Sequence, residues 1–121
     1  MLSFLDAGEE LIKFGRHGSP KAKWVNVTRG RLFWVPSILG RTPSNSKAPT
    51  FIMLVDVKGV VAGKVTHVFK RPVAKGIPQA NCFSVITDYR TLDFQARCPF
   101  VRFALCYAAD LFCVASLTGS Q

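Results

Sequence analysis

Acidic residues are scarce in this chain of 121 residues, where 7 Asp and Glu stand against 16 Lys and Arg and give a formal net charge of +9. The segment from Leu11 to Val55 holds eight basic residues and no acid. This field favours an acidic partner, either a membrane surface or a nucleic acid. It also argues against an enzyme, because so few and scattered acids indicate neither paired carboxylates nor a Ser–His–acid cluster.

Long apolar runs are also lacking. The most apolar stretch, near the C-terminus, is interrupted by Arg102 and Asp110, so its uncharged runs are far shorter than the roughly 20 residues that span a bilayer. We expect no signal peptide before the domain, and Leu2 occupies the position where myristoylation requires glycine. We therefore expect a cytoplasmic protein that lies peripherally on the cytoplasmic face of a membrane.

Metal-ligand spacing is absent from the cysteines and histidines. No CxxC occurs among the four cysteines, and His17 and His67 lie far from most of them. We expect neither a zinc site nor another metal or cofactor. The cysteines are interpreted as small buried apolar residues of a reducing compartment, and they are Cys82, Cys98, Cys106 and Cys113.

What the chain does have is a core and many turn signals. Hydrophobic residues make up 49% and charged residues 19%, which suits one packed domain over residues 1–121 with its core at about 9–115. Nine glycines and seven prolines separate short runs rich in Val, Phe, Trp, Ile and Thr. This punctuation predicts a mainly β fold, either a sandwich or a barrel.

Seven or so strands are expected before a change of pattern near Arg97. A continuous apolar run at 50–57 predicts a buried strand, the run at 60–69 a strand pair or a bulged strand, and the run at 71–80 a basic loop. The remaining strands are expected at 10–15, 21–28, 31–35, 82–88 and 91–96, the last two forming a hairpin around Tyr89-Arg90.

A C-terminal helix is expected over residues 100–115, with Pro99 at its start. Its apolar residues form two stripes, and the second contains Val101, Leu105 and Phe112. One stripe closes the core on one side. The second is either buried by flanking strands or docks a partner chain or a second copy.

This order of strands followed by one helix resembles the pleckstrin homology (PH) domain, in particular the phospholipase C-delta and plant types. The segments that carry the resemblance are 11–14, 21–27, 32–34 and the late hairpin at 82–94, so that it extends over about residues 9–115. It implies a seven-stranded β-barrel or sandwich capped by one C-terminal α-helix. Leu105 stands where the family usually has Trp, which marks a divergent member.

The resemblance also implies a phosphate site in the first two strands. Members that bind phosphoinositides carry Lys, a spacer, then Lys or Arg, one residue, and Arg; this chain has Lys13, seven residues, Lys21, Ala22 and Lys23. Lys21 and Lys23 alternate along a strand and project to one face, and Lys13 can reach the same region across the hairpin. Lys23 replaces the usual forked guanidinium with a point charge. The assisting residues are expected to be Arg16, His17 and Arg41.

These observations predict a non-catalytic module that binds phosphoinositide headgroups on an anionic membrane. The alternative is a protein–protein interaction scaffold of the same fold at a membrane or membrane skeleton, without specific lipid binding. A nucleic-acid partner is the third and least favoured class, although Trp24 and Trp34 near basic residues supply some of its ingredients.

Overall fold

Short alternating segments form the strands of the structure, a computed structural model that describes residues 8–37 and 50–99. The strands are β1 (Glu9–Phe14), β2 (Lys21–Thr28), β3 (Arg31–Pro36), β4 (Thr50–Met53), β5 (Val57–Ala62), β6 (Cys82–Thr87) and β7 (Thr91–Gln95). Short 3-10 helices join some of them: η1 (Leu54–Asp56), η2 (His67–Lys70), η3 (Pro72–Ala74) and η4 (Gln79–Asn81).

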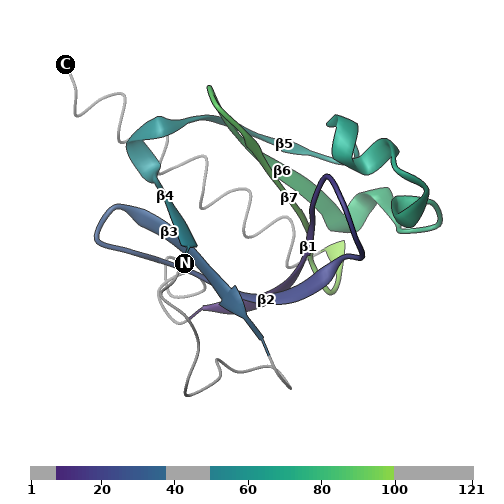
Figure 1. The fold of residues 1–121 in the computed structure, drawn as a ribbon, viewed down its shortest axis with the longest axis horizontal. Helices are drawn as coiled ribbons and strands as arrows, with labels where there is room; N and C mark the ends of the chain where they lie inside the picture. The colour runs from purple at the N-terminus through teal and green to yellow at the C-terminus, as the bar shows by residue number, and fades with distance from the viewer. Residues whose placement is uncertain (1–7, 38–49, 100–121) are drawn as a thin grey trace.

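The seven strands of the described residues form one antiparallel sheet in the order β4-β3-β2-β1-β7-β6-β5 (Figure 1). This result confirms the predicted mainly β, seven-stranded fold. The sheet is open, since β4 and β5 are its two edges and do not pair with each other. η1 turns the chain between these two strands instead of a tight hairpin.

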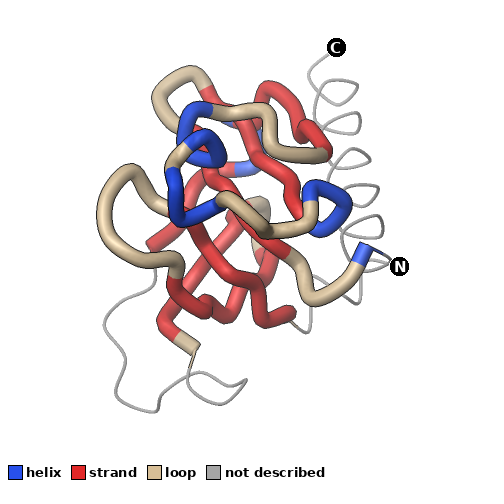
Figure 2. The backbone as a smooth tube through the Cα atoms, turned by 90° about the vertical axis from the view of Figure 1, so that its right-hand side faces the viewer, coloured by secondary structure: helices blue, strands red, loops and turns tan. Residues whose placement is uncertain are grey.

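Hydrophobic side chains pack on both faces of this sheet. Leu11, Val25, Trp34 and Phe94 belong to a cluster on one face. A second cluster on the other face joins Phe14 to residues of the connection between β5 and β6, namely Val68, Phe69 and Ala74, together with Cys82. Alternate residues of β1 therefore serve different clusters, which fixes the register of the strand. Figure 2 shows the strands as one curved sheet with helical turns outside it.

Two of the expected elements were wrong in their extent. The run at 50–57 is a four-residue edge strand followed by η1, and only Ile52 of β4 is buried. The Leu54 backbone N–H donates to the Gly30 carbonyl at 2.8 Å, outside the strand ladder. The run at 60–69 divides into the end of β5 and η2, separated at Gly63, whose φ of +91° favours glycine. Continuous apolar character did not distinguish an edge strand from a buried one.

The other strands agree with their predicted ranges to within one or two residues. The predicted loop at 71–80 contains η3 and most of η4. The expected helix at 100–115, with Val101, Leu105 and Phe112, lies outside the described residues, as does Arg41.

Candidate functional site

The first two strands place three lysines on one face of the sheet. Lys13 and Lys21 are direct partners in the β1–β2 register, and Lys23 is paired with Leu11. Directly opposed residues point to the same face with Cβ atoms about 4.5–5.5 Å apart. The three lysines therefore lie on the same face of the sheet as Leu11 and Val25, which belong to the core.

Lys13 is half-buried and lies beside a tryptophan. Its Nζ is 5.7 Å from the ring centroid of Trp34, which is 6% exposed, and the Arg90 guanidinium is 5.3 Å from the same centroid. Desolvation by burial, then repulsion from Arg90 and Lys23, lower the pKa of Lys13 below its ordinary value, while the Asp93 carboxylate opposes this shift. Lys13 thus lies within the electrostatic reach of two further cations.

A hollow of about 470 Å³ opens beside Lys13. Arg16 and Arg90 also line it, from the β1–β2 loop and the β6–β7 turn, and Asp93 lies at its wall. This volume falls within the roughly 300–1,000 Å³ of small-molecule sites. Lys21 lies opposite Lys13 on β2 without lining the hollow, and the exposed His17 does not line it.

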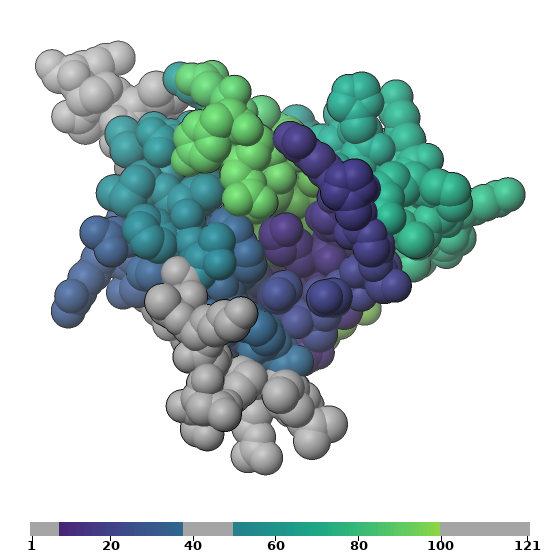
Figure 3. All heavy atoms as spheres, in the orientation of Figure 1, coloured from purple at the N-terminus to yellow at the C-terminus, as the bar shows by residue number. Residues whose placement is uncertain are grey.

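Arg71, a residue that the sequence did not single out, holds the β1–β2 loop. Its guanidinium donates to the Gly15 carbonyl, and its Nη2 donates to the Gly18 carbonyl at 2.8 Å. These bonds join the loop to the connection between β5 and β6, and Figure 3 shows the dark purple loop against that teal-green segment. Arg16 and His17 therefore sit on a tethered loop.

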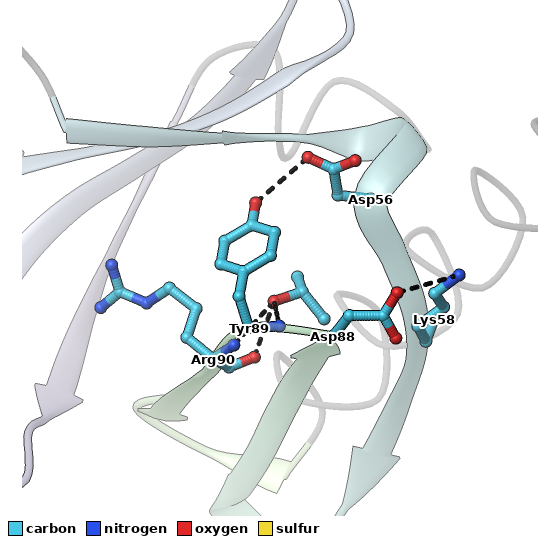
Figure 4. Close-up of polar contacts among 6 residues, drawn as sticks. Asp56, Lys58, Asp88, Tyr89 and Arg90 are labelled. Carbon is cyan, nitrogen blue, oxygen red and sulfur yellow. Dashed lines mark hydrogen bonds and ion pairs between the residues drawn. The ribbon is translucent and has the colours of Figure 1, made fainter.

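Arg90 is the second residue that sequence reasoning missed. It lies in the β6–β7 turn, where Thr87 Oγ1 accepts from the Arg90 backbone N–H at 3.0 Å and donates to the Arg90 carbonyl at 2.8 Å. Tyr89 Oη donates to Asp56 at 3.1 Å, and Lys58 pairs with Asp88 at 3.4 Å. In Figure 4 the Arg90 side chain points away from both of these contacts.

Asp93 is a carboxylate that is only 1% exposed. It accepts hydrogen bonds from three hydroxyls: Thr66 at 2.5 Å, Ser84 at 2.7 Å and Thr91 at 2.9 Å. Buried charge requires such donors. The bonds tie the segment after β5 to β6 and β7 and fix a negative charge near Lys13.

Neither a metal-ligand cluster nor a membrane-spanning helix is found in the part of the chain that the structure describes. Across 8–37 and 50–99, no three His, Cys, Asp or Glu side chains group as metal ligands would. Within these ranges the structure also has no helix of the length and apolar character needed to cross a bilayer.

Neither a family model nor a curated protein matches the chain. Solved structures do match. PLC21 of S. officinalis has a TM-score of 0.71 at 16% identity over 92% of this chain, which spans 16% of the PLC21 chain. ISP3, the inner membrane complex sub-compartment protein of Toxoplasma gondii, has a TM-score of 0.64 at 12% identity over 96% of this chain and 82% of its own.

The N-terminal PH domain of human ARAP2 has a TM-score of 0.59 at 18% identity, covering 88% of this chain and 76% of its own. Identities this low show the fold alone, and the phospholipase C-delta and plant subtype stays a prediction. The strand order, the open seven-stranded sheet and these neighbours together show that the chain has a pleckstrin homology fold.

Proposed function

We propose that this domain is a non-catalytic membrane-targeting module that binds phosphoinositide headgroups through Lys13, Lys21 and Lys23. The observation that carries the proposal is that the three lysines share one face of the β1–β2 pair, where Lys13 lines a hollow together with Arg16 and Arg90. Phosphate oxygens are bound by convergent cations that donate charge-assisted hydrogen bonds. PH folds often bind phosphoinositides or mediate protein interactions, and this cluster favours the first role.

The charge pairing supports the same conclusion. Every acid of the described residues has a hydrogen-bond or ion-pair partner other than these lysines: Glu9 has Arg97, Glu10 has Ser37, Asp56 has Tyr89, Asp88 has Lys58, and Asp93 has three hydroxyls, although the Asp93 charge still acts on Lys13. Within residues 8–37 and 50–99, no acid forms an ion pair with Lys13, Lys21 or Lys23. The absence of an ion pair in these ranges supports the proposal that the cluster binds an external anion.

The magnitude distinguishes specific binding from general attraction. Each basic residue near an anionic bilayer contributes about 1 kcal/mol, so five cations give about 5 kcal/mol, a sub-millimolar dissociation constant. Tighter binding requires hydrogen bonds to a particular headgroup. We expect saturable micromolar binding of a soluble inositol phosphate in isothermal titration calorimetry.

The test is the double variant Lys21→Glu/Lys23→Glu with vesicles that contain a phosphoinositide. Two reversals remove two attractions and add two repulsions, about 4 kcal/mol or roughly a thousandfold loss of affinity. Lys75→Glu is the control for a charge reversal elsewhere on the surface, since Lys75 is exposed and does not line that hollow. Unchanged vesicle binding, with a melting temperature within a few degrees of wild type, would reject the proposal.

A second candidate is a protein-interaction scaffold at a membrane skeleton. The edge strand β4 favours it, because Phe51 and Met53 are exposed on this strand and Phe51 is 42% exposed. The Arg31 guanidinium lies 4.8 Å from the centroid of the Phe51 ring. ISP3, named for an inner membrane complex, shares most of its length with this chain. Self-association that Phe51→Glu abolishes, together with no headgroup preference, would favour this candidate.

A further inference from the structure

The edge strand β4 carries apolar side chains into solvent. Phe51 and Met53 are exposed, whereas Ile52 between them is buried in the core. Val55, in the η1 turn that follows, is exposed as well. Three of the six exposed large hydrophobic residues of the described ranges thus lie within five positions of the chain. A concentration of this kind at the edge of a sheet is typical of an interaction surface.

The backbone of β4, the last strand of the sheet beside β3 (Figure 1), also offers hydrogen-bonding groups. The Leu54 N–H donates to the Gly30 carbonyl at 2.8 Å, one position beyond the last pair of the β3–β4 register. Hydrogen-bonded pairs alternate with non-hydrogen-bonded pairs along an antiparallel ladder. The backbone groups of Ile52 are therefore directed toward β3, and those of Phe51 and Met53 away from the sheet. An extended chain can bond to these outward groups and add a strand.

The charge beside this edge favours an acidic partner. The guanidinium of Arg31, a β3 residue, lies 4.8 Å from the Phe51 ring centroid and so extends over β4. Arg29 is exposed in the adjoining β2–β3 turn. Within residues 8–37 and 50–99, neither arginine forms an ion pair. A second copy would bring the same arginines and its own net charge of +9 to the interface, so we favour an acidic chain over self-association.

We propose that β4 accepts an extended segment of another protein as an eighth strand, with an acidic side chain beside Phe51 and Arg31 and an apolar side chain beside Met53. Side chains two positions apart in a strand share a face, so the recognised pattern is an acidic and an apolar residue separated by one position. Main-chain bonds hold the segment, and these two side chains select it. The inference rests on the second candidate, the interaction scaffold, and does not involve the lysines of β1 and β2.

The probe is the capped heptapeptide Thr-Val-Thr-Glu-Thr-Val-Thr, whose palindromic sequence presents the same pattern in either strand direction. Titration into the whole chain, followed by amide NMR, should shift the Phe51 and Met53 amides. A peptide with Lys in place of Glu should bind about fivefold more weakly, the effect of one exposed ion pair of about 1 kcal/mol. Arg31→Glu should reverse this preference, and Lys75→Glu, a reversal at an exposed residue outside β3 and β4, should not.

Two N-methylated peptides test the strand itself. Methylation of Glu and both Val removes the N–H donors on one edge of the peptide, and methylation of the Thr residues removes those on the other edge. Because an added strand pairs along one edge only, one of these peptides should lose binding and the other should retain it. Phe51→Thr should weaken binding of the unmodified peptide, and Val73→Thr, a change at an exposed valine of η3, is its matched control.

Unshifted β4 amides at millimolar peptide, or equal binding of the two methylated peptides, would overturn strand addition. Equal affinity for the Glu and Lys peptides, or equal effects of Arg31→Glu and Lys75→Glu in variants that melt like wild type, would overturn the acidic partner. Dimers in analytical ultracentrifugation that Phe51→Thr abolishes, and that exclude the peptide, would reject the inference in favour of a second copy. Vesicle binding by the same variants tests the lysine site separately.

Discussion

Lys13→Met should weaken anion binding without destabilising the protein. Lys13 Nζ and the Arg90 guanidinium lie 5.7 and 5.3 Å from the Trp34 ring centroid, so they can be no farther apart than about 11 Å, the sum of these distances. Two like charges at this separation repel by about 0.4 kcal/mol in water and by about 1.5 kcal/mol at an effective dielectric constant of about 20. The folded protein therefore carries a repulsion that an uncharged side chain would remove.

The change in stability follows from a balance of small contributions. Methionine keeps the length of the Lys13 side chain against Trp34, loses a cation–π contact of about 0.5–1 kcal/mol, and removes both the repulsion and the desolvation of the ammonium group. We expect a free energy of unfolding between the wild-type value and about 1 kcal/mol above it. For a chain of this size that is a rise in melting temperature of at most about 6 °C.

The effect on binding should have the opposite sign. A charge-assisted hydrogen bond contributes about 1.5–3 kcal/mol, so inositol phosphate affinity should fall about 10- to 150-fold. Urea unfolding and isothermal titration measure the two effects. Lys21→Met is the matched control, since Lys21 is exposed and opposite Lys13 and should lose affinity without a change in stability. A Lys13→Met protein that is destabilised by more than about 1 kcal/mol, or that binds normally, would refute this reasoning.

Two further predictions concern Lys13 and Arg71. Because the pKa of Lys13 lies below 10.5 in the folded protein, its amine loses its proton before that of an unfolded lysine, so anion affinity should fall, and unfolding free energy should rise, as pH increases toward 10.5. Titrations of Lys13→Arg, which stays charged, should show a smaller loss of affinity; identical profiles would contradict the assignment. Arg71→Ala removes the bonds to the Gly15 and Gly18 carbonyls and should lower the free energy of urea unfolding by about 1–3 kcal/mol. It should also accelerate amide exchange at residues 15–20. Unchanged exchange would show that Arg71 does not hold this loop in place.

Most of the sheet could be predicted because its signals are local. The β2–β3 hairpin turns at Arg29 and Gly30, whose φ angles of +52° and +74° match the glycine signal in the sequence. The β6–β7 hairpin was found from two strand-like runs around Tyr89-Arg90 in the same way. The prediction for residues 50–69 was wrong because apolar composition does not indicate which strand lies at the edge of a sheet. Ile52 is buried, whereas Val55 is 71% exposed.

The candidate site likewise contains some residues that local sequence signals predict and others that only the three-dimensional fold brings together. Lys13, Lys21 and Lys23 could be grouped from spacing, since a hairpin register follows from the length of its loop. Arg71 contacts residues 56 and 53 positions earlier in the chain, a relation that no local pattern reports. The signal available for Arg90 was its place at the tip of a predicted hairpin, but a turn arginine is ordinarily solvated. Only the packing of β7 beside β1 brings it to Trp34.

The net charge alone does not show which basic residues lack an ion-pair partner, because this depends on where the acids lie in the fold. In the sequence, the net charge of +9 lies mainly in the first two-thirds of the chain. The structure adds which residues pair with the few acids that it describes. Glu10 meets Ser37, and Asp93 meets Thr66, each across 27 positions. These carboxylates bond to other residues of the fold, and none forms an ion pair with the lysines of β1 and β2 in residues 8–37 and 50–99. In the proposed site, lysines without an internal ion-pair partner would attract an anion more strongly than paired lysines.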